Sequence, residues 1–428
     1  MNPEALPPRP APGRPVWLQV GVLLDGASGP VRDAHVVYDA EQILYAGAED
    51  RLPPEAVLGR GQREPDWRSR TATLLPGLSE AHAHLFLEGG ELDPARRAAH
   101  LQRPPAELLA AAEPRLRRLI DWGVVAVRDA GDRNGVGLAL SRRYQQKDRP
   151  PLPYLDSPGA AIHRQGRYGS FMADPIEREG SPRLSVAARV AAGADRIKLI
   201  PTGIINFQRG AVTTEPQMTA AEVREIVEAA RAAGRQSFAH ASGDAGIDRA
   251  IEGGVDSVEH GYFIREDQLA RLAESGIAWV PTFAPVAAQV RHADRMGWDQ
   301  AVRDNLRRIL EGHAASLRRA HQLGVRIIAG SDAGSYGVPH GSGLLWELQL
   351  MEEAGLPTAA VIRSATSAGP ERLAYREKFG RIAPGHRSRF ILARQPPLET
   401  VDHLARERVV VFDGEPRELG AGASDAGL

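Results

Sequence analysis

The 428-residue sequence contains no cysteine. Disulfide bonds, Cys₄ zinc sites, iron–sulfur clusters and thiol nucleophiles are therefore excluded, and any metal must be bound by nitrogen and oxygen. Aromatic residues make up only 5% of the chain, and 53 basic residues against 54 acidic ones give a formal charge of -1. With neither a basic excess nor a basic motif interleaved with aromatic residues, a nucleic-acid partner would lack its main source of attraction.

Long apolar runs are also lacking. No stretch reaches the ~18–20 residues that cross a bilayer, and residues 1–14 are proline-rich, without the basic and apolar regions of a signal peptide. We therefore expect a cytoplasmic protein with no membrane partner. Lysine is scarce as well, because only positions 147, 198 and 378 carry it and the other 50 basic residues are arginine.

The pattern of apolar residues divides the chain into two kinds of region. Short apolar runs separated by turns occupy the first ~75 residues and recur near the C-terminus, and neither end is long enough to bury a core alone. They predict one small β-sandwich domain built from residues 1–75 and 380–428. Residues 76–379 alternate β-type runs with Ala-, Arg-, Glu- and Leu-rich helical stretches, which indicates βα units.

Eight β-type runs within residues 76–379 predict an α/β fold, a (β/α)8 TIM barrel. They span residues 77–84, 124–129, 153–160, 196–200, 236–240, 255–259, 277–282 and 325–332. Helices are expected between them, for example over residues 220–233, 266–273 and 300–323. In such barrels the chemistry takes place at the C-terminal ends of the strands.

Five of the eight predicted strands end in side chains that can bind a metal, directly or after modification: His82, His84, Lys198, His240, His260 and Asp332. His82 and His84 point to the same side of a strand, about 6.6–7 Å apart, either to share an ion or as a surface pair. His240 and His260 predict a second ligand pair on neighbouring strands, or two ordinary core histidines. Asp332 is suited to be a monodentate ligand and proton acceptor, or it caps the next turn.

Lys198 lies between apolar residues on a predicted buried strand. A buried ammonium must be paired, neutral or modified. Two interpretations remain open: a buried Lys–Asp pair, or a neutral amine that captures CO₂ and becomes a carboxylate able to bridge two metals. Arginine is a poor substitute in the second case because its guanidinium stays protonated. In a chain so rich in arginine, a lysine here fits a requirement for an amine.

These residues stand in segments that resemble the metal-dependent amidohydrolase superfamily. The segments are Leu75-Pro76-Gly77-Leu78, His82-Ala83-His84, residues 123–131 and 192–198, Gly330-Ser331-Asp332-Ala333-Gly334, and residues 380–385. They are most similar to the imidazolonepropionase-like branch with a carbamylated lysine, which includes dipeptidases and related amide hydrolases. The family commonly has aspartate where this chain has Glu80.

The resemblance implies an enzyme that hydrolyses a C–N bond of a small amide or peptide-like substrate. It implies a binuclear centre in which His82, His84 and Asp332 hold one ion, His240 and His260 hold the other, and Lys198, carboxylated on its amine, bridges them. Zn²⁺ fits nitrogen and oxygen ligands with an open position best, and manganese and iron stay open as alternatives. Asp332 would then be catalytic, taking up a proton as a metal-bridging hydroxide attacks the carbonyl.

Candidate substrate contacts are the residues His163, Arg167, Tyr168 and His340. The first three lie in the loop after the third strand, whose alternative interpretation is a solvated basic loop, and His340 follows the eighth strand. Residues 202–214 are long enough to form a lid. Arginines near the pocket would suit a carboxylate-bearing substrate, which favours dipeptides and N-acyl amino acids.

Other functions stay open at this point. A deaminase or iminohydrolase of a heterocycle would use one metal, but such enzymes usually lack a bridging lysine on the fourth strand. A carbamate, ester or phosphotriester hydrolase would use the same metal pair. A non-catalytic barrel would be expected to lose a ligand, and none is lost here. The family often forms oligomers, so the resemblance is compatible with a homo-oligomer.

Overall fold

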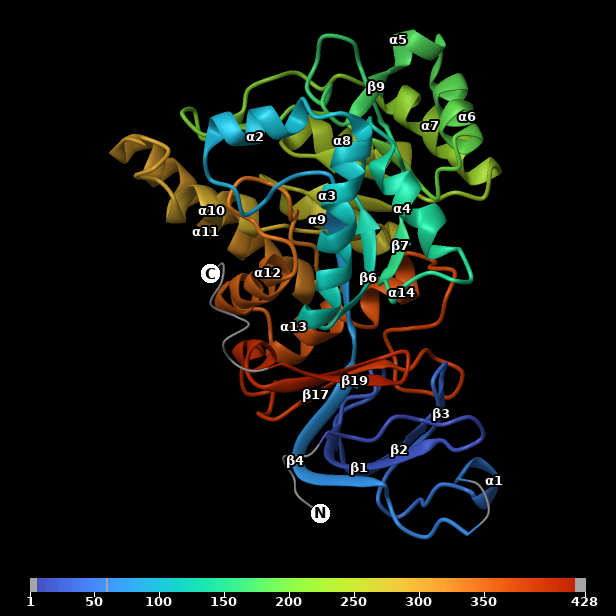
Figure 1. The fold of residues 1–428 in the computed structure, drawn as a ribbon. Helices are drawn as coiled ribbons and strands as arrows, with labels where there is room; N and C mark the ends of the chain where they lie inside the picture. Colours follow the sequence, from blue (N-terminus) through green and yellow to red (C-terminus); the bar gives the residue numbers. More distant parts are fainter. Residues whose placement is uncertain (1–5, 59–60, 420–428) are drawn as a thin grey trace.

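The computed structural model describes residues 6–58 and 61–419. A helix-covered barrel forms one end of the molecule and a small β domain forms the other (Figure 1). Among the helices of these described residues, none is both long and apolar enough to cross a membrane.

The small β domain is one seven-stranded sheet assembled from both ends of the chain, with the order β19-β18-β17-β4-β1-β2-β3. Its strands are β1 (Val16–Leu23), β2 (Val31–Tyr38), β3 (Ile43–Gly47), β4 (Trp67–Pro76), β17 (Arg389–Ala393), β18 (Arg408–Phe412) and β19 (Glu415–Leu419). Although β4 and β1 separate β17 from β2 in the sheet, Phe390 and Tyr38 meet with ring centroids 5.1 Å apart. The sheet therefore folds over its own core, as a sandwich does.

The barrel is a ring of parallel strands that begins directly after β4. Its strands are β5 (Leu78–Ala83), β6 (Val124–Asp129), β7 (Tyr154–Asp156), β8 (Ala161–His163), β10 (Ile197–Leu199), β13 (Ser237–Ala241), β14 (Ser257–His260), β15 (Ala278–Val280) and β16 (Arg326–Ile327). Backbone hydrogen bonds close the ring between its first and last strands, from Ala81 to Ala329 at 3.0 Å and from Asp332 to His82 at 2.7 Å. The predicted TIM-barrel fold is confirmed.

The third barrel strand differs from the continuous strand predicted over residues 153–160. It is split into β7, which pairs with β6, and β8, which pairs with β10. Pro158 has no backbone N–H to donate, and Gly159 adopts a left-handed φ of 61°. These two residues interrupt the hydrogen-bonding pattern between the two halves of the strand.

Helices follow most barrel strands and cover the outside of the ring (Figure 1). They are α2 (Pro94–Leu101), α3 (Pro105–Arg118), α4 (Val136–Tyr144), α5 (Ile176–Glu179), α6 (Pro182–Ala191), α7 (Ala220–Ala232), α8 (Asp244–Gly253), α9 (Glu266–Ser275), α10 (Ala284–Arg291), α11 (Gln300–Gln322), α12 (Ser342–Glu353), α13 (Thr358–Ala365) and α14 (Ala368–Arg372). Shorter elements are α1 (Glu55–Leu58), β9 (Ala173–Pro175), η1 (Leu119–Trp122), η2 (Val401–Ala405) and a hairpin of β11 (Ile205–Asn206) and β12 (Ala211–Val212). The three helices named from sequence agree with α7, α9 and α11 to within two residues.

The amino ends of the first barrel strands adjoin the small domain. Gly77 donates its backbone N–H to Arg389 of β17. A Cβ atom added at Gly123 would lie 2.6 Å from Ile391, so the close approach requires glycine there. The C-terminal ends of the strands therefore open away from the small domain.

Candidate metal centre

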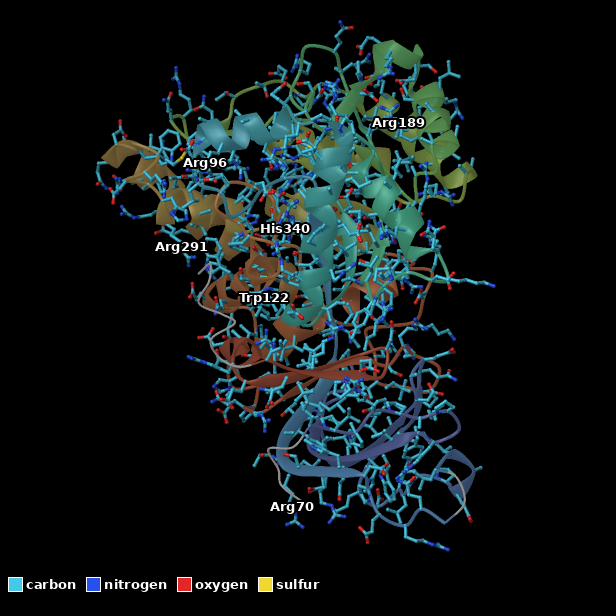
Figure 2. All side chains as sticks on the ribbon, in the orientation of Figure 1. Arg70, Arg96, Trp122, Arg189, Arg291 and His340 are labelled. Atoms are coloured by element: carbon cyan, nitrogen blue, oxygen red, sulfur yellow. The ribbon has the colours of Figure 1, made fainter. Side chains whose placement is uncertain are left out.

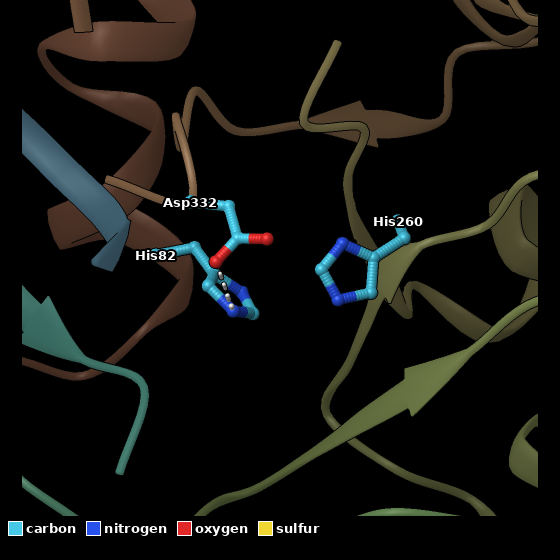
Figure 3. A group of neighbouring side chains, drawn as sticks. All are labelled: His82, His260 and Asp332. Atoms are coloured by element: carbon cyan, nitrogen blue, oxygen red, sulfur yellow. Dashed lines mark ion pairs between the residues drawn. The ribbon is translucent and has the colours of Figure 1, made fainter. Parts of the chain in front are cut away.

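The predicted metal ligands meet inside the barrel at the C-terminal ends of its strands. They are His82 of β5, His84 directly after β5, Lys198 of β10, His240 of β13, His260 of β14, and Asp332 in the segment after β16, and all six side chains are buried. The ligand atoms of His82, His260 and Asp332 lie within 4.8 Å of one another (Figure 3). His84 Nε2 is 3.6 Å from Asp332 Oδ1, and the His240 and His260 ring centroids are 4.6 Å apart.

Two of the ligands sit on backbone that departs from ordinary strand geometry. His260 has a φ of 67° and Asp332 a φ of 55°, both in the left-handed region. Non-glycine residues adopt this region at a cost in free energy, and they do so most often where a functional side chain must be aimed. Thr282, which lies 2.8 Å from His260 Nδ1, shares this geometry with a φ of 52°.

The hydrogen-bond partners of the histidines fix which ring nitrogen is free. His84 Nδ1 donates to the Gly131 carbonyl at 3.0 Å, and His240 Nε2 donates to the Gly203 carbonyl at 3.3 Å. Since a carbonyl oxygen can only accept, the opposite nitrogen of each ring keeps its lone pair. This arrangement of a ring N–H on a protein oxygen is typical of metal-binding histidines.

His82 is held in the same way by the carboxylate of Glu259, which forms a buried ion pair with Arg128. Its Nδ1 lies 2.6 Å from a Glu259 carboxylate oxygen, and Arg128 lies 2.7 Å from that carboxylate. Ser257 donates to Glu259 as well, at 2.6 Å. Arg128 and Glu259 were not among the site residues predicted from sequence. The feature of the sequence that could have pointed to them is that each is a charged residue on a predicted buried strand.

Glu80 occupies the position where the family commonly has aspartate. Its carboxylate accepts hydrogen bonds from the backbone N–H of His82 at 3.0 Å and from that of Ser331 at 2.9 Å. The side chain therefore ties β5 to the segment that carries Asp332. The longer glutamate makes a supporting contact on both sides of the centre.

Lys198 lies on the floor of the site, with Nζ 3.5 Å from His82 Nε2. Burial lowers the pKa of Lys198 to about 8, against the opposing effect of the Asp332 and Glu259 carboxylates. Within the described chain no carboxylate oxygen comes within ion-pair distance of its amine. The buried Lys–Asp pair, one of the two interpretations of the sequence, is therefore not formed.

The donor set fits a divalent metal. Burial is the main cause that lowers the pKa of His82, His84 and His260 below the usual range, so their imidazoles are neutral donors. Asp332 Oδ1 is buried and makes no hydrogen bond. Neutral imidazoles beside an uncommitted carboxylate oxygen are the ligands that Zn²⁺ and similar ions prefer.

A cavity of about 230 Å³ opens directly onto these ligands. Of the four residues predicted to contact substrate, Tyr168 lines the cavity, with its ring centroid 5.3 Å from that of His240. Arg167 is exposed and donates to the backbone carbonyl of Glu215 outside the cavity. The remaining two, His163 and His340, do not line the cavity.

His163 and His340 contact the backbone of the site. His163 is buried beneath the loop that carries Tyr168 and is absent from the cavity wall. His340, labelled within the barrel domain in Figure 2, donates from Nε2 to the backbone carbonyl of His84 at 3.0 Å. It therefore supports the turn after β5.

Comparison with known proteins identifies the class of protein that this barrel with its candidate metal site represents, a hydrolase. Residues 73–416 match the amidohydrolase family, and the chain belongs to it. It is similar to ochratoxinase of Aspergillus niger, with 26% identity over 92% of this chain and 84% of that protein. It is therefore an enzyme that hydrolyses C–N bonds.

Solved structures show the same architecture. A Xaa-Pro dipeptidase with methionine bound in its active site superposes with a TM-score of 0.77 and 25% identity, covering 94% of this chain and 100% of that one. The crystal structure of A. niger ochratoxinase superposes with a TM-score of 0.76 and 22% identity, covering 95% and 96%. Because the identity to the ochratoxinase structure is only 22%, that similarity supports the shared fold and nothing further.

Proposed function

We propose that this chain is a binuclear metal-dependent hydrolase that cleaves an amide or peptide-like C–N bond of a small molecule. The observation that carries the proposal is the convergence of six buried donors at one end of the barrel, with ring nitrogens left free by their partners. His82, His84 and Asp332 would hold one divalent ion, most suitably zinc. His240 and His260 would hold the other.

Lys198 would hold both ions after its amine takes up CO₂. The amine is buried and unpaired by any carboxylate, and its lowered pKa increases the fraction that is neutral and able to react. Two bound ions would supply a water of lowered pKa and polarise the scissile carbonyl. The protein contributes the geometry, the exclusion of bulk water and the movement of the proton.

Asp332 would accept the proton that the attacking water loses and would pass it to the departing nitrogen. Its Oδ1 makes no hydrogen bond and faces the site, and burial raises its pKa to about 7. A carboxyl group with such a pKa can accept a proton near neutral pH and return it to the departing nitrogen. For an amide this transfer is necessary, since an unprotonated amine is a poor leaving group.

Metal analysis combined with turnover on a substrate panel tests the proposal. The panel comprises N-acyl amino acids, dipeptides, aryl amides and carbamates. About two ions per chain together with amide cleavage would support it. One ion per active chain with release of ammonia from a heterocycle would instead support the deaminase.

The role of Asp332 has its own test. Asp332→Asn is expected to lose nearly all turnover even under conditions in which the protein is saturated with metal, because the amide cannot accept the proton. Metal content measured on the same sample separates loss of metal from loss of proton transfer. Substantial turnover by the metal-loaded variant would contradict the assignment.

A further inference from the structure

We propose that the cavity selects an uncharged apolar group, so that the preferred substrates are neutral aromatic or aliphatic amides in place of N-acyl amino acids. This inference rests on the proposed function. It differs from the expectation that arginines near the pocket bind a substrate carboxylate. The composition of the cavity wall, its rigidity and its charge all favour a neutral substrate.

The cavity wall is mostly aromatic and aliphatic. Among its apolar and aromatic residues are Tyr168, Phe171, Ile204, Ile205, Phe207 and Tyr336. Tyr168 and Phe171 pack edge to face with ring centroids 6.0 Å apart. Burying an apolar substituent against such a wall is favourable, in proportion to the apolar area removed from water.

Part of this wall comes from the β11–β12 hairpin, which the sequence suggested as a lid. The hairpin is anchored because Asn305 of α11 donates to the backbone carbonyls of Phe207 at 2.9 Å and Gln208 at 3.0 Å. Phe207 also packs against Trp298, with ring centroids 6.3 Å apart. The apolar wall is therefore preformed, which lowers the cost of binding.

The polar groups on the wall outside the metal ligands are uncharged. Gln289 is positioned by Trp298, whose Nε1 donates to its Oε1 at 3.1 Å. The Tyr336 side chain also lines the cavity, and its buried hydroxyl has no hydrogen-bond partner among the described residues. Neutral groups of this kind recognise an amide, ether or carbonyl without requiring a counter-ion.

Charge on the described cavity wall is confined to Lys198 and Asp332 of the metal centre. The Arg97 guanidinium lies 5.8 Å from the Tyr336 ring but donates to the backbone carbonyls of Glu91 and Gly334. A carboxylate placed deep in the apolar part of the cavity would lose its hydration without gaining a cationic partner. Burial of an isolated ion in this way is strongly unfavourable.

A matched pair of ligands tests the inference. N-phenethylbenzamide and N-benzoyl-L-phenylalanine share the same amide and both rings, and differ only in a carboxylate. We expect the neutral compound to bind the zinc-loaded Asp332→Asn protein at least tenfold more tightly, measured by calorimetry, and to have the higher kcat/KM with the zinc-loaded enzyme. Equal or tighter binding of the carboxylate compound would overturn the inference.

The two measurements separate this inference from the proposed function. Tighter binding of the neutral compound without hydrolysis of either one would support the selection and contradict the proposed reaction. Hydrolysis with a preference for the carboxylate compound would support the proposed reaction and contradict the selection. Binding is therefore the measurement that decides the inference.

A pair of variants on the hairpin provides a second test. Ile204 lines the rim of the cavity and is 52% exposed, so Ile204→Arg adds a cation there without disturbing a core. It should shift the binding ratio toward the carboxylate compound by at least fivefold. Gln208→Arg, at an exposed position of the same hairpin outside the cavity, should leave the ratio unchanged. An equal shift in both variants, or none in Ile204→Arg, would contradict the selection.

Discussion

Lys198 is the residue on which the proposed metal pair depends most directly. It is one of three lysines in the chain, and it is buried where the other two are exposed. A carboxylated amine at this place would supply a negative charge between the two histidine pairs. Arginine would keep its charge and bring no oxygen.

Replacing Lys198 tests this role by chemical rescue. Lys198→Ala should reduce kcat/KM by more than ~100-fold, because loss of a ligand should exceed the 10–100-fold effect of losing a supporting partner. Acetate should restore part of the activity of Lys198→Ala, since a small carboxylate can occupy the vacated space, but should not restore Lys198→Arg. Lys147→Ala, at an exposed position, is the matched control. Full activity of Lys198→Arg would contradict the carboxylated amine.

Glu259 is the residue that orients His82, and its replacement should weaken metal binding. Glu259→Gln removes the charge that faces His82 Nδ1 and Arg128. We expect metal affinity, measured by competition with a chelator, to fall roughly 10–100-fold. The exposed Glu266→Gln should retain the affinity of the unchanged protein, and an equal affinity in Glu259→Gln would remove this residue from the account.

At the scale of elements, the sequence predicted where strands lie but did not predict that the third barrel strand is interrupted. β6 spans the predicted residues 124–129, and β5 agrees within one residue at each end. The break between β7 and β8 was missed because the apolar run continues past Pro158 and Gly159. Local hydrophobicity reports burial, whereas the change of neighbour from β6 to β10 depends on the closure of the whole barrel.

The break between β7 and β8 is accompanied by a buried ion pair that should be costly to disrupt. Arg196, just before β10, donates from Nε to Asp156 of β7 at 2.8 Å, and both side chains are 4% exposed. Asp156→Ala would leave the guanidinium buried without this partner and should lower the free energy of unfolding by about 3–5 kcal/mol. Denaturant unfolding measures this change, with the exposed Asp148→Ala as the control. A loss below about 1 kcal/mol would show that the pair is dispensable.

At the scale of the whole molecule, the two parts share one hydrophobic core. Ile391, Val410 and Phe412 of the small domain belong to the same buried cluster as barrel residues such as Leu116 and Ile120. A second core lies inside the small domain itself. Contacts across the boundary are therefore continuous, and the barrel and the small domain should unfold together.

Calorimetry of a variant at this boundary tests the shared core. Phe412→Ala should lower the free energy of unfolding by about 3–5 kcal/mol and preserve a single transition, because it opens a cavity in the core that both parts use. The variant should keep its metal, since the ligands lie at the other end of the barrel. Two separate transitions, with only the first shifted, would contradict the shared core.

The convergence of the proposed ligands could be predicted from sequence because each of them stands at the end of a recognisable strand in a characteristic motif. The contacts that hold these side chains and the cavity wall in place could not be predicted from sequence. Arg128 and Glu259 are separated by 131 positions, and Asn305 holds a hairpin almost a hundred positions away. The cavity wall likewise combines side chains from many loops, whose packing no local pattern records.

The number of divalent ions in the active enzyme tests the central claim most directly. Elemental analysis should be made on the zinc-loaded chain during removal of metal by a chelator, with turnover recorded on the same samples. We predict about two ions per fully active chain, with activity lost as the ions are removed and restored by zinc together with bicarbonate. Full activity with a single ion per chain would contradict the binuclear centre.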